Sequence, residues 1–200
     1  MFVSAENHPT PINPEVALAK LHEGNARFVN NTMSTAKPTA ARRAETAHAQ
    51  HPFAIVLACA DSRVAPEIVF DQNIGDLFVI RNAGNLVDDH VKGSIEFAVQ
   101  LFGVRLVVVV GHEECGAVTA ALAGPSAPAR VQSLVRDIQP AVQAVKGKPG
   151  DPLQLAVAEN ARLMAEMIRK EAEFGEAAKD VRIVSAVYDL HSGKVTWKED

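Results

Sequence analysis

The chain has 200 residues, of which 48% are hydrophobic and 22% charged, and its formal net charge is −4. This length and composition indicate a single globular domain with a buried core. A negative net charge without a basic block argues against nucleic acid as the main partner. No apolar run approaches the roughly 20 residues of a membrane span, and residues 1–11 lack the pattern of a signal peptide. We therefore expect a cytoplasmic protein with no membrane partner.

Residues 1–50 are predicted to form an N-terminal helical arm. Pro14 opens a stretch, residues 14–30, in which Val16, Leu18 and Leu21 recur at roughly helical spacing. The polar residues that follow, 31–50, favour a short helical continuation of this arm.

Residues 51–123 carry the pattern of a parallel sheet. The runs FAIVLA (53–58), DLFVI (76–80) and LVVVV (106–110) are short and apolar, which is typical of strands covered on both faces. Between the last two, residues 91–103 place apolar side chains on one helical face and end at a glycine. This order predicts a strand, helix and strand joined by a right-handed crossover.

Residues 124–180 predict two helices, the first bent or broken near Pro140 and the second capped by Asp151 with Pro152 in its first turn. Residues 181–200 alternate around an HSG turn and predict an antiparallel hairpin. The predicted fold class is α/β, with a mostly parallel central sheet flanked by helices, an N-terminal helical arm and a C-terminal hairpin. No G-x-G-x-x-G follows the first strand, so a dinucleotide-binding domain is not favoured.

The two cysteines lie just beyond two of the predicted strands. Cys59 follows residues 53–58, and His112 and Cys115 follow residues 106–110. The cysteine count alone leaves a disulfide, two unrelated buried thiols and a metal site open. Because carboxyl ends of parallel strands meet at one edge, adjacent strands would bring these residues to one crevice. Two sulfurs and one imidazole with an open fourth position are typical of catalytic zinc.

Three segments resemble the β-class carbonic anhydrases: CADSRVAPEIVFDQNIGDLFVIRNAGN (59–85), GSIEFAVQLFG (93–103) and GHEECGAV (111–118). The resemblance covers about residues 50–123 and extends more loosely to LHEGNARF (21–28) and VYDLHSGKV (187–195). It implies reversible hydration of carbon dioxide to bicarbonate and a proton, with one Zn2+ per subunit. It also implies an obligate homodimer, often paired into a dimer of dimers, with active clefts at the dimer interface.

The same resemblance assigns roles to individual residues. Cys59, His112 and Cys115 match the zinc ligands. Asp61 and Arg63 match a catalytic dyad in which the arginine holds a carboxylate that orients the zinc-bound hydroxide. The substrate positions are Gln50, which reaches bicarbonate across the dimer interface, Phe78, Ala83 and Phe97, which line the CO2 pocket, and Gly116, whose backbone N–H meets substrate.

Simpler interpretations of these positions stay open. Phe78 and Phe97 are equally compatible with core packing, Gln50 with a solvated side chain and Gly116 with a packing glycine. Asp61 and Arg63 by themselves are compatible with a surface ion pair that caps a turn.

Glu113 departs from the family pattern, which has a small hydroxyl residue or a tyrosine there. It either favours the following helix N-terminus or acts on the pKa or protons of the site. His51 and His90 are proton-shuttle candidates by residue type alone.

Two other functions remain as alternatives. One is hydrolysis of carbon disulfide or carbonyl sulfide on the same fold. The other is a non-catalytic zinc module in which Asp61 closes the fourth position.

Overall fold

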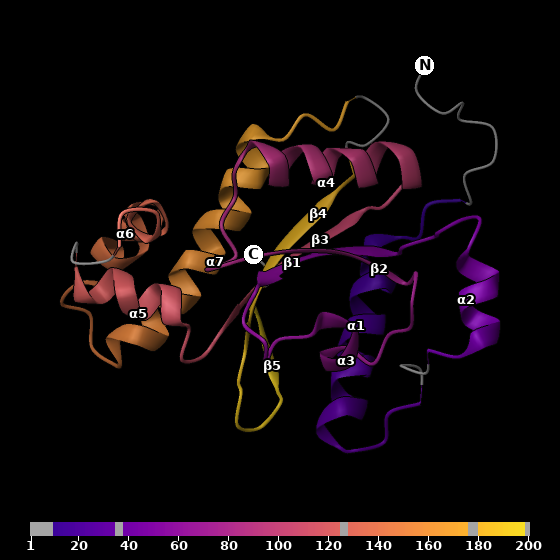
Figure 1. Ribbon diagram of the computed structural model, residues 1–200, viewed down its shortest axis with the longest axis horizontal. Helices are drawn as coiled ribbons and strands as arrows, with labels where there is room; N and C mark the ends of the chain where they lie inside the picture. The colour runs from indigo at the N-terminus through magenta and orange to yellow at the C-terminus, as the bar shows by residue number, and fades with distance from the viewer. Residues whose placement is uncertain (1–9, 35–37, 125–127, 176–179, 199–200) are drawn as a thin grey trace.

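The computed structural model describes residues 10–34, 38–124, 128–175 and 180–198. Its centre is a five-stranded sheet in the order β2-β1-β3-β4-β5 (Figure 1). Four strands run parallel, and the fifth is antiparallel to its neighbour. The strands are β1 (Ala54–Cys59), β2 (Leu77–Asn82), β3 (Leu106–His112), β4 (Arg182–Tyr188) and β5 (Val195–Lys198). The predicted fold class, with its mostly parallel sheet and terminal hairpin, is confirmed.

Helices cover the sheet on both faces (Figure 1). One face packs against α4 (Asp89–Phe102) and α7 (Pro152–Glu171), while α5 (Gly116–Ala123) and α6 (Val131–Val145) pack on each other and on α7. The other face packs against α1 (Pro14–Val29) and α3 (Pro66–Val69). Along β1, Ile55 and Leu57 belong to the first core, whereas Ala54 and Val56 belong to the second. The period-two alternation of a strand therefore explains why apolar residues run continuously through β1 and β3.

The N-terminal arm consists of α1 and α2 (Ala40–Thr46), as predicted. No side chain of α2 is buried. The helix is instead attached through Arg42, whose Nη2 lies 2.7 Å from Asp76 Oδ1 at the start of β2.

The helix ends follow the sequence signals, whereas a proline inside α6 does not break that helix. Gly103 ends α4 in the left-handed conformation, with φ 67°, and the Asp151 side chain accepts hydrogen bonds from the first turn of α7. Of the two expectations for Pro140, a break is wrong, because α6 continues through this residue from Val131 to Val145, and a bend stays a prediction. Proline removes only the hydrogen bond to the carbonyl four residues earlier, that of Arg136. Both residues are exposed, so water can satisfy that carbonyl.

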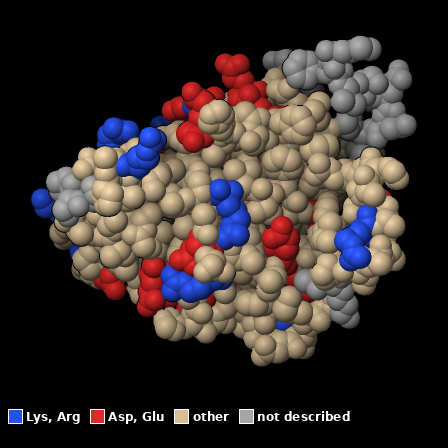
Figure 2. Space-filling model, in the orientation of Figure 1, with Lys and Arg blue, Asp and Glu red and all other residues tan. Residues whose placement is uncertain are grey.

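Among the described residues, no helix is both long enough and apolar enough to span a membrane. On the face shown in Figure 2, acidic and basic side chains lie in small groups among uncharged ones. The visible charge is therefore divided between both signs rather than gathered into one field.

A buried amide joins the N-terminal arm to the C-terminal hairpin. Asn25 of α1 donates from Nδ2 to the carbonyl oxygens of Val69, at 3.1 Å, and Gly193, at 2.8 Å. Its Oδ1 accepts from the N–H of Val195 at 2.9 Å. One side chain thus ties α1 to the end of α3 and to the turn between β4 and β5.

We expect Asn25→Ala to lower the free energy of unfolding by about 3 kcal/mol, because three buried backbone groups lose their partner. Urea unfolding followed by circular dichroism measures the change. Glu23→Ala, an exposed substitution in the same helix, is the control and should stay within about 0.5 kcal/mol of the native protein. Equal losses in the two variants would contradict the role of the Asn25 amide.

Candidate metal centre

The parallel pairing of β1 with β3 brings the two predicted motifs to one edge of the sheet. Cys59 is the last residue of β1, His112 is the last residue of β3, and Cys115 is the N-cap of α5. Their ligand atoms all lie within 4.8 Å of one another, and all three residues are buried. Both cysteines are free, so the disulfide alternative is wrong. The predicted cluster of two sulfurs and one imidazole is confirmed.

The hydrogen bonds of His112 leave one ring nitrogen available for a metal. Nδ1 lies 2.8 Å from the carbonyl oxygen of Glu113, to which an N–H at this position donates. Nε2 is buried and has no hydrogen-bond partner within the described part of the chain. A buried polar atom without a partner is rare in folded proteins unless a water or an ion meets it. The donor set and this orphaned nitrogen therefore fit Zn2+.

The two thiols differ in their protonation because they interact with each other. The side chains of Cys115 and, less strongly, His112, together with the N–H groups of Gly84 and Asp61, lower the pKa of Cys59 to about 4, although burial opposes this shift. The Gly84 N–H lies 3.4 Å from Cys59 Sγ. The pKa of Cys115 is raised because it donates to Cys59 and because it is buried. One sulfur is thus ready to bind a cation, and metal binding would displace the proton of the other.

Arg63 holds the carboxylate of Asp61 beside the cluster. Its Nε donates to Oδ1 at 2.9 Å and its Nη2 to Oδ2 at 2.8 Å. This bidentate pair holds the pKa of Asp61 well below its usual range. Asp61 Oδ2 also lies 3.9 Å from His112 Nε2. The pair therefore faces the metal cluster rather than standing alone at the surface.

Arg81 fixes the chain around this dyad, and the sequence analysis missed it. Its Nε donates to the carbonyl oxygen of Cys59 at 3.0 Å and its Nη2 to that of Asp61 at 2.6 Å. The residue follows the apolar run of β2, and no spacing rule marks it. Only the pairing of β1 with β2 reveals its position.

Two of the predicted substrate residues lie next to the cluster. Ala83 precedes Gly84, whose N–H contacts Cys59 Sγ. Gly116 is the first residue of α5, and a Cβ added there would meet no other described atom within 4 Å. Close packing therefore does not require a glycine at this position, and the helix N-terminus is open there.

The other predicted substrate residues lie away from the cluster within one chain. Phe78 and Phe97 pack near each other, with ring centroids 6.5 Å apart, in a group that includes Phe102. Phe78 pairs with Ile55 at the amino-terminal half of the sheet. Gln50 is exposed and precedes β1, so it too lies toward that end. Their roles at the site stay predictions that depend on a second subunit.

The polar residues at the rim of the site include two glutamates that follow His112. Burial and the neighbouring Asp189 raise the pKa of Glu113. Glu114 lies between Arg63 and His191: its carboxylate oxygens are 3.7 Å from Arg63 Nη1 and 3.7 Å from His191 Nε2. No sequence pattern points to His191, because the turn that carries it is distant in sequence from the metal motifs.

The two histidines suggested as proton shuttles occupy other places. His51 lines a small cavity with Phe102 and Gly103, at the amino-terminal end of β1. His90 lies in the first turn of α4. Their proposed role stays a prediction.

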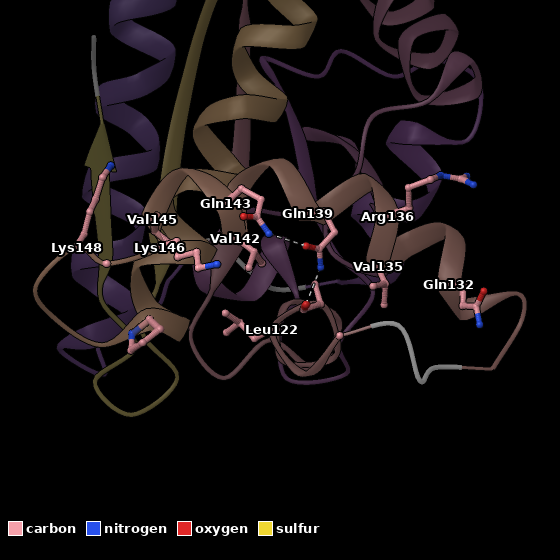
Figure 3. A pocket seen from close by; sticks show the side chains of 14 residues that line it. Leu122, Gln132, Val135, Arg136, Gln139, Val142, Gln143, Val145, Lys146 and Lys148 are labelled. Carbon is pink, nitrogen blue, oxygen red and sulfur yellow. Dashed lines mark hydrogen bonds between the residues drawn. The ribbon is translucent and has the colours of Figure 1, made fainter.

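A cavity of about 790 Å³ lies between α5, α6 and the turn before α7 (Figure 3). Gln139 spans it from α6, donating to the carbonyl oxygen of Ala121 at 2.7 Å and accepting from Gln143 at 3.3 Å. The described residues that line it include no histidine, cysteine, aspartate or glutamate. The cavity therefore lacks carboxylate, imidazole and thiol side chains, and the candidate metal ligands lie elsewhere, at the Cys59, His112 and Cys115 cluster.

Comparisons with known proteins agree with this geometry. A family model described as carbonic anhydrase matches residues 54–195. Carbonic anhydrase 2 of Mycobacterium tuberculosis is 48% identical over 126 residues, which make up 63% of this chain and 61% of that protein. The carbonic anhydrase of Mycolicibacterium smegmatis gives the same identity and coverage. The chain thus matches less than two thirds of the length of these relatives.

Solved structures show the same fold. The β-carbonic anhydrase CcaA superposes with a TM-score of 0.68 at 25% identity, over 90% of this chain and 94% of that one. A Coccomyxa β-carbonic anhydrase in complex with acetazolamide also gives a TM-score of 0.68, at 24% identity, over 90% of this chain and 85% of that one. With the family match over most of the sheet and both metal motifs, these similarities show that the chain belongs to the β-class carbonic anhydrase family.

Proposed function

We propose that this chain catalyses the zinc-dependent, reversible hydration of carbon dioxide to bicarbonate and a proton. The observation that carries the proposal is the buried Nε2 of His112, which lies without a hydrogen-bond partner in the described chain, beside two cysteine sulfurs and the arginine-held Asp61. Membership in the family, and the names of the relatives that match, support the same activity.

Cys59, His112 and Cys115 would each supply one ligand to a single Zn2+. Bound zinc lowers the pKa of water, for which carbonic anhydrase with three histidine ligands is the standard example, and so makes hydroxide available at neutral pH. Two thiolates and a neutral imidazole cancel the charge of the ion. This leaves the protein to direct the nucleophile toward the carbon of CO2.

Asp61 is suited to that orienting role because it stays ionised. Arg63 keeps its pKa low, so the carboxylate can only accept hydrogen bonds. A hydrogen bond accepted at this position turns a lone pair of the donor oxygen toward substrate. The two bonds from Arg63 also restrain Asp61 from taking the fourth place on the ion. This restraint favours an open, catalytic site over a closed structural one.

The substrate residues complete the proposal. The N–H of Gly116, at an open helix N-terminus, would donate to the developing bicarbonate. Ala83 would border the place where CO2 meets the cluster. Gln50, Phe78 and Phe97 would act across a subunit interface, since they lie toward the opposite end of the sheet in their own chain.

Native protein is expected to contain one zinc ion per chain and to hydrate CO2. Cys115→Ser should lose stoichiometric zinc and about 100-fold or more of kcat/KM, because an alcohol is a poor replacement for a thiolate ligand. Inductively coupled plasma mass spectrometry measures the metal, and stopped-flow pH indicators measure hydration. Native protein without a transition metal would refute the proposal. If the same samples turn over carbon disulfide or carbonyl sulfide faster than CO2, that compound and not CO2 is the substrate.

Arg63→Ala should retain zinc and lower kcat/KM by about 100-fold, because Asp61 is then free to turn or to bind the ion. Arg63→Lys should recover little of the loss, since an ammonium group lacks the planar fork of the guanidinium. Arg136→Ala is the matched control: it removes the same charge from an exposed position on α6. Full activity in Arg63→Ala would show that the dyad has no catalytic role.

We also propose that the chain forms a homodimer, which can pair into a dimer of dimers. Val16 of α1, Ile68 of α3 and Phe97 of α4 are large apolar side chains that one chain leaves about half exposed. Burial against a second subunit would remove this surface from water.

Light scattering should therefore give twice or four times the mass of one chain. Ile68→Asp should shift the protein toward monomer, because a charge would enter the interface, whereas Arg136→Ala should leave the mass unchanged. A native protein that is monomeric at micromolar concentration would contradict the homodimer.

A further inference from the structure

The groups nearest the metal cluster are unable to carry away the proton that hydration releases. The guanidinium of Arg63 keeps all its protons at neutral pH and has no lone pair to accept another. Asp61 is a weak base, because its bonds with Arg63 hold its pKa well below the usual range. An acceptor must therefore lie further out. Among side chains, imidazole is the one whose charge ordinarily changes near neutrality.

Charged side chains form a continuous row from the cluster to solvent. Asp61 Oδ2 lies 3.9 Å from His112 Nε2 and accepts from Arg63. Glu114 follows, 3.7 Å from Arg63 Nη1, and His191 Nε2 lies 3.7 Å from the other oxygen of Glu114. Side-chain exposure rises along the row from 19% for Asp61 to 49%, 59% and finally 79% for His191. The row therefore reaches open water at His191.

The register of the sheet is a second, independent reason why His191 lies near the cluster. Tyr188, the last residue of β4, pairs with His112 of β3, and its carbonyl oxygen accepts from the N–H of Glu113 at 3.0 Å. His191 follows Tyr188 by three residues, in the turn that leads to β5. The turn thus begins directly beside the metal-ligand histidine.

The backbone of this turn is fixed while the imidazole stays accessible. Asp189 Oδ1 accepts from the N–H of His191 at 2.7 Å and of Ser192 at 3.2 Å. The Gly193 carbonyl accepts from the buried Asn25. The backbone of His191 is therefore held near the site, while its ring is accessible to water.

From this placement we propose that His191 accepts the proton of CO2 hydration and delivers it to solvent, a role that rests on the activity proposed above. Hydroxide adds to the carbon of CO2 and leaves as bicarbonate; the water that takes its place must then lose a proton to become hydroxide, and this proton travels through water to the ring. There the lone pair of a ring nitrogen forms an N–H bond. A buffer base then removes the proton and restores the neutral ring. The charged ring is stabilised by Glu114, 3.7 Å from its Nε2, and by the charge of Glu113, whereas Asp189 on the same turn bonds to the backbone N–H of His191.

The test compares native protein with His191→Ala and His191→Lys at low and high buffer concentration. At low buffer concentration, kcat should fall on the order of tenfold in both variants. This loss is smaller than that expected for most general bases, because water and the remaining buffer also accept the proton. The ratio kcat/KM should stay within about twofold, because it omits steps after bicarbonate leaves. Concentrated imidazole buffer should restore kcat. Lysine keeps a positive charge near Glu114, so a purely electrostatic role would survive in His191→Lys.

A second measurement does not depend on activity. In zinc-loaded protein, the carbon-bound ring proton signal of His191 should move as the pH is changed, and it should do so over the same pH interval in which kcat of the native protein changes. Lys194→Ala, an exposed change in the same turn, should leave kcat unchanged. Native kcat in His191→Ala at low buffer, full function in His191→Lys or a ring signal that does not change with pH would each overturn the proposal. A native protein that hydrates no CO2 in any buffer would instead refute the proposed function.

Discussion

The site depends on the parallel pairing of β1 with β3. Their register, Ile55 opposite Val107 through Ala58 opposite Val110, ends both strands at one edge and so brings Cys59 to His112. Cys59 shares a face with Ile55 and Leu57, in the core beneath α4 to α7. A slip of one residue would turn the thiol toward α1 and bury the wrong side chains on both faces. The apolar packing of the two strands therefore fixes the metal ligands as well as the fold.

Asp61 presents a conflict that the surrounding arginines resolve. A carboxylate this close to a divalent cation is itself a good ligand, and binding there would close the fourth position. Arg63 occupies both carboxylate oxygens, and Arg81 holds the backbone carbonyl of the same residue. Both guanidinium groups act on the short segment that follows β1. The candidate metal ligand Cys59 and the carboxylate proposed to orient the nucleophile thus depend on the same strand end.

The sequence was sufficient for features that depend on local pattern. Continuous apolar runs predicted the strands, and the residues just beyond two of them predicted the cluster of Cys59, His112 and Cys115. Contacts between distant segments leave no such pattern, so Arg81 and Asn25 were missed although both hold backbone of the site or its rim. The break expected at Pro140 was wrong because the cost of a proline in a helix depends on whether water reaches one carbonyl group. The sequence alone does not show this. The places of Gln50, Phe78 and Phe97 depend on geometry beyond one chain.

His112 is buried and His191 is exposed, and this difference suits the two histidines to different roles. His112 is buried, and its Nδ1 bond to a carbonyl fixes which nitrogen faces the cluster. Interactions with an ion are strong there because little water screens them. The same burial denies this ring exchange with solvent. His191 has the opposite environment: its ring is exposed to water, and it belongs to no cluster of candidate metal ligands among the described residues. In the reaction proposed here, an imidazole at the end of a central strand would hold the metal in a dry site, and a second one on the adjoining hairpin would release protons to water.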